Sequence, residues 1–248
     1  MNLTAVSSFI EDVQTLKTPG DVQIAFEEFL QARGFHHFAC CSHIDYAAPP
    51  SGSVFVDNYP DEWAHYFVAN RLERYDPVLA YCRQKLVGFN WSDPGLIRSM
   101  NQKQADIMFR AAGFGLRLGH TIPFHYQDHH PASLSVSGSP DAMQKENIYA
   151  IQLVAPYLYQ KLYEIGRSPG GLKDRPKVKL SDLEFKCLIF AAQGKSDWDI
   201  AQICDLTTGS VAHALGRVRA KFGVSSRVQA TVHALHNGYL DFHTIMNP

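Results

Sequence analysis

The last quarter of the chain, from Lys179 to Asp241, restricts the fold more than any other segment. Apolar residues recur there at helical spacing in four short runs, and turn-forming residues separate the runs. Ser181 precedes the first run and Glu184 follows three residues later, which is the pattern of a capping box at a helix start. Asp197 is suited to cap the second run. Four short helices with these turns predict a helix-turn-helix fold.

The third predicted helix carries small and basic side chains on its outward face. A helix that enters the major groove of DNA must fit a space about 12 Å wide, which such side chains allow. We predict DNA contacts from Ser210, Ala212, His213, Gly216, Arg217, Arg219 and Lys221. Among these, His213 and Arg217 are placed to donate to base edges. Arg219 and Lys221 lie late in the helix and suit phosphate contacts.

The distribution of charge agrees with this interpretation. The whole chain has a net charge of −1, yet the residues from Lys173 onward hold 10 Lys and Arg against 7 Asp and Glu. Because this excess is small, we expect modest nonspecific affinity for DNA and a need for dimerisation. An ordinary four-helix bundle with a solvated basic face is the alternative that helix spacing alone leaves open.

The residues before this segment mix helical and strand patterns. A stretch rich in Gly, Pro and charge at 166–179 predicts a linker, so we place a first domain at 1–165 and a second at 180–248. The expected helices of the first domain are 2–16, 20–33, one opened by Pro60, 102–112 and 141–164, and its expected strands are 35–44, 52–57, 116–125 and 131–138. Strands in the middle with helices at both ends predict an α/β/α sandwich. The fold class is therefore α+β, with the sandwich followed by an all-α four-helix helix-turn-helix domain.

The C-terminal segment resembles the DNA-binding domain of LuxR-type regulators. The matching residues are Leu180, Ser181, Glu184, Leu188, Gly194, Lys195-Ser196, Ile200-Ala201, Val211, Lys221-Phe222-Gly223-Val224, Arg227, Gln229-Ala230 and Gly238. Two positions depart from the family: Ala214 stands where a His is usual, and Arg217 where an Asn is common. We expect the fold to survive both changes and the DNA sequence that is read to differ.

The N-terminal segment resembles the autoinducer-binding domain of the quorum-sensing branch of that family. The matching residues, in the family's order and intervals, are Tyr59-Pro60-Asp61-Glu62-Trp63, Asp76-Pro77, Asn90-Trp91-Ser92, Gly113-Phe114-Gly115-Leu116 and Gly119-His120-Thr121-Ile122-Pro123. The resemblance therefore implies a pocket for an N-acyl homoserine lactone.

Such a ligand has a few polar groups in an apolar body, and each one buried without a partner costs about 1–3 kcal/mol. The resemblance implies that Trp63 donates to the lactone carbonyl and that Asp76 accepts from the amide N–H. It further implies that Trp91 stacks on the lactone ring and that Tyr59 and Ser133 reach the acyl-side carbonyl. Taken singly, a Trp is usually a core residue and an Asp before Pro is usually a helix cap. The joint spacing favours the binding roles.

One departure falls within this expected site. Phe67 stands where the family usually has Tyr, so the aromatic wall is kept and a hydroxyl is lost. An acyl chain without a 3-oxo group, or an aryl chain, is therefore compatible with the site. Phe67 also leaves an alternative open. The chain would then be a solo regulator that senses a different small molecule, such as a plant or host metabolite. Cys82 should lie near the pocket as a buried thiol.

These features together predict a ligand-responsive transcription factor of the cytoplasm. Its expected partners are double-stranded DNA at a palindromic promoter site, an N-acyl homoserine lactone and a second copy of the chain, with RNA polymerase as a further candidate. The five cysteines form no CxxC pair, which favours reduced thiols. The N-terminus has no signal-peptide pattern, and no apolar run is long enough to span a membrane. We expect no cofactor and no membrane partner.

Two further classes of protein fit the sequence less well than a ligand-responsive regulator. A phosphorylated response regulator would need an acidic pair, a phosphoacceptor Asp and a later Lys, and the N-terminal segment shows no such arrangement. An enzyme with a metal site could use a histidine-rich stretch, whose members are His120, His125, Asp128, His129 and His130. That stretch falls in a predicted hairpin loop, where histidines are usually solvated. We therefore expect neither catalysis nor a metal.

Overall fold

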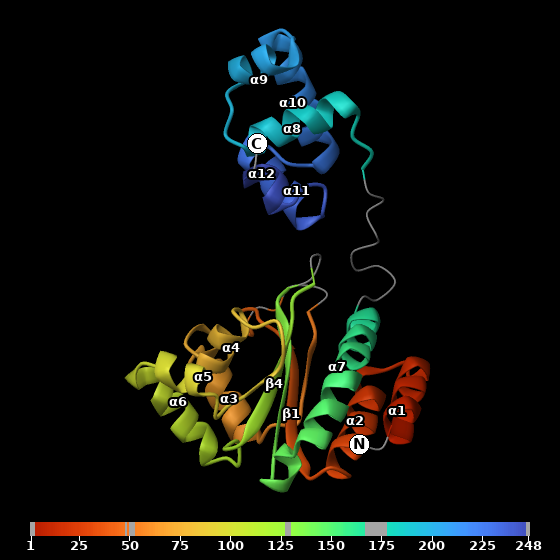
Figure 1. Ribbon diagram of the computed structural model, residues 1–248, viewed down its shortest axis with the longest axis vertical. Helices are drawn as coiled ribbons and strands as arrows, with labels where there is room; N and C mark the ends of the chain where they lie inside the picture. The colour runs from red at the N-terminus through yellow and green to blue at the C-terminus, as the bar shows by residue number, and fades with distance from the viewer. Residues whose placement is uncertain (1–2, 48, 50–52, 127–129, 167–177, 247–248) are drawn as a thin grey trace. The chain divides into compact units, whose positions relative to one another are not determined.

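The computed structural model describes residues 3–47, 49, 53–126, 130–166 and 178–246. The chain divides into two compact units, Met1–Lys173 and Asp174–Pro248 (Figure 1). Most of the predicted linker, residues 167–177, lies outside the described residues, so its bounds stay a prediction. None of the described helices combines the length and the apolar character needed to cross a membrane.

The first unit is built on a five-stranded antiparallel sheet with the strand order β2-β1-β5-β4-β3. The strands are β1 (Phe35–Ser42), β2 (Phe55–Asp57), β3 (Phe89–Asn90), β4 (Gly119–Phe124) and β5 (Ala132–Gly138). Nearly every residue of β4 and β5 is buried, on both faces of the strands. This burial indicates that helices cover both faces of the sheet.

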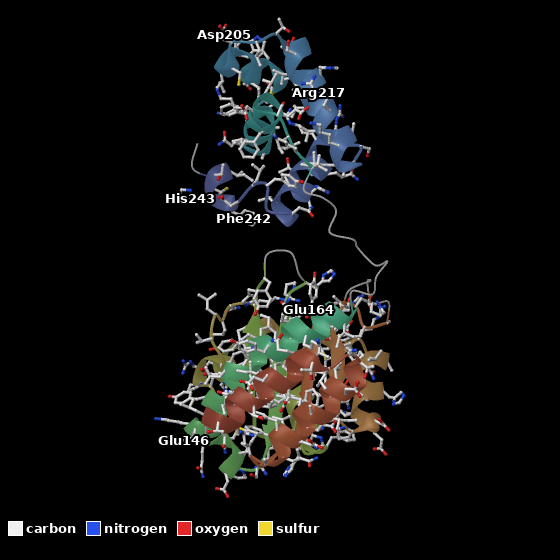
Figure 2. The ribbon with its side chains drawn as sticks, turned by 90° about the vertical axis from the view of Figure 1, so that its right-hand side faces the viewer. Glu146, Glu164, Asp205, Arg217, Phe242 and His243 are labelled. Carbon is white, nitrogen blue, oxygen red and sulfur yellow. The ribbon has the colours of Figure 1, made fainter. Side chains whose placement is uncertain are left out.

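The helices form two layers, as the predicted sandwich requires. One layer consists of α1 (Leu3–Thr15), α2 (Pro19–Gln31) and α7 (Lys145–Gly166). Figure 2 shows this layer face on, with Glu146 and Glu164 marking the ends of α7. The opposite layer consists of α3 (Asp61–Ala69), α4 (Pro77–Cys82), α5 (Pro94–Ser99) and α6 (Gln102–Ala112) (Figure 1). Each layer packs its own hydrophobic core, one against each side of the sheet.

Local sequence signals predict most of the observed helix and strand bounds. Most differences between the predicted and the observed elements concern short elements. The structure also contains β3, α4, α5 and the 3-10 turn Leu72–Arg74, which were not predicted, because two to six residues give no clear periodicity. The helix predicted at 141–164 is a 3-10 turn at Asp141–Met143 followed by α7. The second helix begins at Pro19, since Thr18 accepts from the N–H of Asp21 and proline is tolerated in a first turn. The second strand begins at Phe55 rather than at residue 52.

The second unit contains the four predicted helices and a short fifth one. These are α8 (Asp182–Ala192), α9 (Asp197–Cys204), α10 (Thr208–Phe222), α11 (Arg227–His236) and α12 (Phe242–Met246). The capping box of Ser181 and Glu184 is confirmed by both of its hydrogen bonds. The prediction that Asp197 caps α9 is wrong, because Ser196 accepts from the N–H of Asp199 and forms the cap instead.

Candidate ligand pocket and nucleic-acid interface

A pocket lies between the sheet and the layer of α3, α4 and α6. Its empty volume is about 840 Å³, part of which opens to solvent, and its lining is mostly apolar. All six of the predicted ligand-binding residues line it, namely Tyr59, Trp63, Phe67, Asp76, Trp91 and Ser133. Small-molecule sites are typically concave and mostly apolar with few polar groups, and this lining has that character. The structure thus brings together residues that are up to 74 positions apart in the sequence.

Trp63 presents an unused hydrogen-bond donor to the pocket. It lies in the first turn of α3 and is only 3% exposed. Its indole Nε1–H makes no hydrogen bond with any residue in the described part of the chain. An indole N–H is a donor only, so one without a protein partner at a pocket wall is suited to a ligand acceptor.

Trp91 differs from Trp63 in this respect. Its Nε1–H donates to Oγ1 of Thr121 at 2.9 Å, and that oxygen lies 2.8 Å from Oγ of Ser135. The ring packs against Gly119, where an added Cβ would lie 2.6 Å from the indole. Only glycine therefore fits at position 119 with the ring in this place. Trp91 offers its ring to the pocket, as the predicted stacking role requires.

Asp76 caps α4 and lines the pocket with the same carboxylate. Its Oδ1 accepts from the N–H of Val78 at 2.7 Å and from that of Leu79 at 3.0 Å. Burial raises the pKa of Asp76 to about 6, although these two N–H donors oppose the shift. None of its hydrogen bonds with described residues uses Oδ2. Asp76 and Trp63 thus both line the pocket, and each has a polar atom without a hydrogen-bond partner among the described residues.

The sheet side of the pocket carries hydroxyl and thiol groups. Ser133 and Ser135 lie two residues apart on β5, so their side chains point to the same face of the sheet. Ser133 is paired with Cys41 of β1. Burial raises the pKa of Tyr59 well above its usual value, so its hydroxyl stays a neutral donor. Ser135 and Cys41 were not among the predicted ligand-binding residues. The alternation of strand residues from Ser133 would have indicated Ser135.

Phe67 belongs to an aromatic part of the pocket wall. Its ring centroid lies 5.9 Å from that of Trp63 and 6.2 Å from that of Tyr46, which in turn lies 5.2 Å from Phe55. Four aromatic rings thus surround this part of the cavity. Such a wall suits an apolar chain or ring of a ligand.

Cys82 and the described residues of the histidine-rich stretch lie outside this lining. Cys82 is fully buried in the same core, and burial raises the pKa of its thiol to about 12. His125 approaches the carbonyls of Cys82 and Lys85, and the buried His120 contacts the side chains of Asn90 and Gln152. Asp128 and His129 lie outside the described residues. Within the described ranges, no group of three or more metal-ligating side chains gathers.

The predicted DNA-contacting residues lie on α10, which follows α9 after a turn through Asp205 in the left-handed region. Exposed members are Ser210, Ala212, His213, Arg217 and Lys221, while Gly216 and Arg219 are half-buried. Ser210 and Ala212 lie in the first half of the helix, and Figure 2 labels Arg217 further along it.

Two of these cations are engaged by one buried carboxylate. Glu184 of α8 is 2% exposed, and its Oε1 accepts from Nε of Arg217 at 2.9 Å. Its Oε2 accepts from Nζ of Lys221 at 2.6 Å and from the N–H of Ser181 at 2.8 Å. Arg217 was predicted to contact bases and Lys221 phosphates, whereas their hydrogen bonds to α8 were not predicted.

The charge cluster fixes the protonation of Glu184. Burial by itself would raise its pKa, but hydrogen bonds from Lys221, from the N–H of Ser181 and from Arg217 outweigh burial and lower the pKa to about 2. Glu184 is therefore ionised at neutral pH and holds the middle of α10 against the start of α8.

Comparison with known proteins gives two family matches. The model of the autoinducer binding domain matches residues 18–162. The model of bacterial regulatory proteins, luxR family, matches residues 178–234. The first match covers the five strands and the helices from α2 to most of α7, and the second covers α8 to α10 and most of α11.

Relatives along the whole chain are transcriptional regulators. The HTH-type quorum sensing-dependent transcriptional regulator RpaR of Rhodopseudomonas palustris is 28% identical over 232 residues, which cover 94% of this chain and 93% of that protein. The transcriptional activator protein LuxR of Aliivibrio fischeri is 22% identical over 237 residues, which cover 94% of this chain and 93% of that protein.

Solved structures share the fold. Escherichia coli SdiA aligns with a TM-score of 0.64 at 20% identity, covering 96% of this chain and 99% of its own. SdiA in complex with octanoyl-rac-glycerol aligns with a TM-score of 0.62 at 20% identity and covers 94% of both chains.

Proposed function

Because this chain belongs to the luxR family of bacterial regulatory proteins that carry an autoinducer-binding domain, we propose that it binds an N-acyl homoserine lactone of acyl or aryl type in its pocket. We further propose that it acts in the cytoplasm and binds a palindromic promoter site as a homodimer. The family consists of transcriptional regulators and not of enzymes.

The observation that carries this proposal is the pairing of two polar groups in an apolar cavity. The indole N–H of Trp63 has no partner among the described residues, and neither has Oδ2 of Asp76. A lactone carbonyl would accept from Trp63, and the amide N–H would donate to Asp76. The ring of Trp91 offers an apolar face for the lactone, and the acyl or aryl chain would lie among the rings around Phe67.

Ligand binding is expected to stabilise the sensor unit. The apolar pocket, part of which opens to solvent, leaves the packing between the sheet and α3 to α6 incomplete. A ligand at a hundred times its dissociation constant adds about 2.7 kcal/mol to the free energy of unfolding. We propose that this gain makes the dimer competent for DNA. Equal solubility, dimerisation and DNA binding with and without ligand would contradict that coupling.

The identity of the ligand is tested by extraction. The full chain is expressed in cells that receive a mixture of acyl- and aryl-homoserine lactones, and the purified protein is analysed by mass spectrometry. Recovery of one lactone in a molar ratio near one to one supports the proposal. Recovery of another small molecule instead, from cells supplied with plant or host extracts, supports the alternative regulator without a lactone partner.

The affinity for the lactone should depend on pH through Asp76. Its pKa is raised to about 6 in the ligand-free protein, and an N–H donor from the ligand would lower it. Binding then releases a proton, so affinity rises with pH up to about 6 and becomes constant above about 7. Below pH 6 the affinity should fall by up to about tenfold per pH unit. Calorimetric titrations between pH 5 and pH 7.5 measure this, and a flat profile would exclude Asp76 as the acceptor.

The proposed dimer has a candidate surface on α7. Tyr149, Leu153 and Tyr157 recur every four residues and are all exposed. This apolar stripe lies along one side of a 22-residue helix. A homodimer formed there would supply the two DNA-binding units that a palindromic site requires.

Two substitutions on α10 should separate base reading from phosphate contact. His213→Ala should lower discrimination between the operator and unrelated DNA by about 1–3 kcal/mol, since His213 is exposed at the middle of the helix. Arg219→Ala should instead weaken binding to all DNA. It should also reduce the slope of the logarithm of the binding constant against the logarithm of the salt concentration by about one. Fluorescence anisotropy at several salt concentrations measures both, with an operator selected from random-sequence DNA. Equal effects of both substitutions on operator and unrelated DNA would contradict the assignment.

A further inference from the structure

A histidine behind the pocket wall contacts one of the predicted ligand-binding residues. His43 follows the end of β1, and its backbone N–H donates to the carbonyl of Pro131 just before β5. Its Nε2 lies 2.9 Å from Oγ of Ser133. Ser133 lines the pocket, whereas His43 does not. His43 therefore lies behind Ser133 and contacts the hydroxyl of this lining residue.

The surroundings of His43 keep its ring neutral. Burial lowers its pKa, and the nearby Arg83 and His125 lower it further, to about 4. A neutral imidazole carries one N–H and one acceptor nitrogen, and the two tautomers place them oppositely. The direction of the hydrogen bond to Ser133 thus depends on which nitrogen holds the proton.

The other ring nitrogen decides between the tautomers. Nδ1 of His43 is buried and has no hydrogen-bond partner in the described part of the chain. A buried donor without a partner is rarer in native proteins than a buried acceptor without one. The tautomer with the proton on Nε2 leaves only a lone pair unpaired at Nδ1. In that tautomer His43 donates to Oγ of Ser133.

We propose that His43 is a positioning residue that directs the hydroxyl proton of Ser133 toward an acceptor oxygen of the ligand. A serine hydroxyl has one donor and two acceptor positions, and His43 occupies one of the acceptor positions. The thiol of Cys82 lies near Ser133 and is the other candidate acceptor for its proton, but sulfur accepts weakly. This inference rests on the proposed function, where the acceptor is the acyl-side carbonyl of a lactone.

The tautomer can be measured on the ligand-free full chain. Histidine labelled with a nitrogen isotope gives long-range proton–nitrogen correlation spectra that distinguish a proton on Nε2 from one on Nδ1. The chain has 12 histidines, and the spectrum of His43→Gln identifies the signals of His43. A proton on Nε2 is the expected result. A proton on Nδ1 would overturn the proposal, whatever ligand the protein binds.

A double-mutant cycle tests the effect on the ligand, with N-octanoyl homoserine lactone as the probe. His43→Leu should lower the affinity roughly fivefold in the wild-type background and not at all in the Ser133→Ala background. His43→Gln keeps an amide donor and should retain most of the affinity. Thermal unfolding of each ligand-free variant shows whether the fold is intact.

The outcomes separate this inference from the proposed function. Equal losses from His43→Leu in both backgrounds would mean a structural role only and would overturn the inference. If the wild-type protein binds no acyl-homoserine lactone, the proposed function is wrong. The tautomer of His43 then decides alone whether the hydroxyl of Ser133 is directed into the pocket.

Discussion

Asp76→Asn is expected to lower the affinity for an acyl-homoserine lactone by about 10- to 100-fold without destabilising the ligand-free protein. The substitution replaces the free carboxylate oxygen by an amide donor, which would meet the donating N–H of the ligand. A hydrogen bond to a charged group contributes about 1.5–3 kcal/mol. Asparagine is also a good helix cap, so Val78 and Leu79 at the start of α4 keep their acceptor.

The ligand-free stability should stay equal or increase. The raised pKa of Asp76 means that its charge is buried at a cost, which grows as the pH rises from its usual value of 3.8 to about 6. Above that range the charged form destabilises the empty protein, and a neutral asparagine removes this term. Thermal unfolding at pH 7 and calorimetric titration with the lactone measure the two effects separately.

Asp93→Asn is the matched control for this prediction. Asp93 also precedes a proline and caps a helix, since its Oδ1 accepts from the N–H of Gly95 at 2.7 Å. It does not line the pocket. The control should therefore leave lactone affinity unchanged. Similar losses of affinity in both variants would show that helix capping, and not contact with the ligand, explains the effect at position 76.

Glu184→Ala is expected to destabilise the DNA-binding unit by about 2–3 kcal/mol. The substitution removes a buried carboxylate that joins α8 to α10 and closes the capping box. Breaking a fully buried ion pair costs about 3–5 kcal/mol, and the partial exposure of Arg217 and Lys221 reduces this, because water can solvate them. Hydrogen exchange of α8 and α10 in the full chain measures the loss.

The same carboxylate predicts the response of this unit to acid. The pKa of Glu184 in the folded protein, about 2, lies below its usual value of 4.5. Its contribution to stability is therefore complete above about pH 4.5 and is lost as the pH falls toward 2. The Glu184→Ala variant should lack this part of the acid sensitivity.

Asp199→Ala is the control for Glu184→Ala. Asp199 occupies the same capping-box position at the start of α9, but it is only half-buried and its only described side-chain partner is Ser196. Its replacement should cause a smaller loss, limited to the first turn of α9. Equal losses in the two variants would mean that Arg217 and Lys221 add nothing to the cap.

The sequence predicted the elements with the strongest local patterns. The long helices and central strands of the sensor unit follow from periodicity, and Ser181 with Glu184 predicted the first helix of the second unit together with its cap. These features depend on residues within a few positions of one another. Short elements such as β3 and α5 escaped, because two to six residues leave no period to detect.

The candidate site was predicted as a set of residues, mainly through the family resemblance, and not as a geometry. All six predicted ligand-binding residues line one cavity, but only the structure distinguishes Trp63 from Trp91. The N–H of Trp91 is used by Thr121, 30 positions away, whereas that of Trp63 has no partner among the described residues. Their roles toward a ligand stay predictions.

The amino-acid sequence by itself determined the two kinds of domain, their order and the residue types available for binding. Hydrophobic periodicity, caps and turns are local properties of the chain, so they can be identified without knowledge of the tertiary structure. Tertiary structure alone decided which polar atoms are free. Glu184 engages Arg217 and Lys221, and His43 reaches Ser133, 90 positions away. A hydrogen bond requires approach within about 3 Å, and packing brings such distant residues together in ways that no local pattern records.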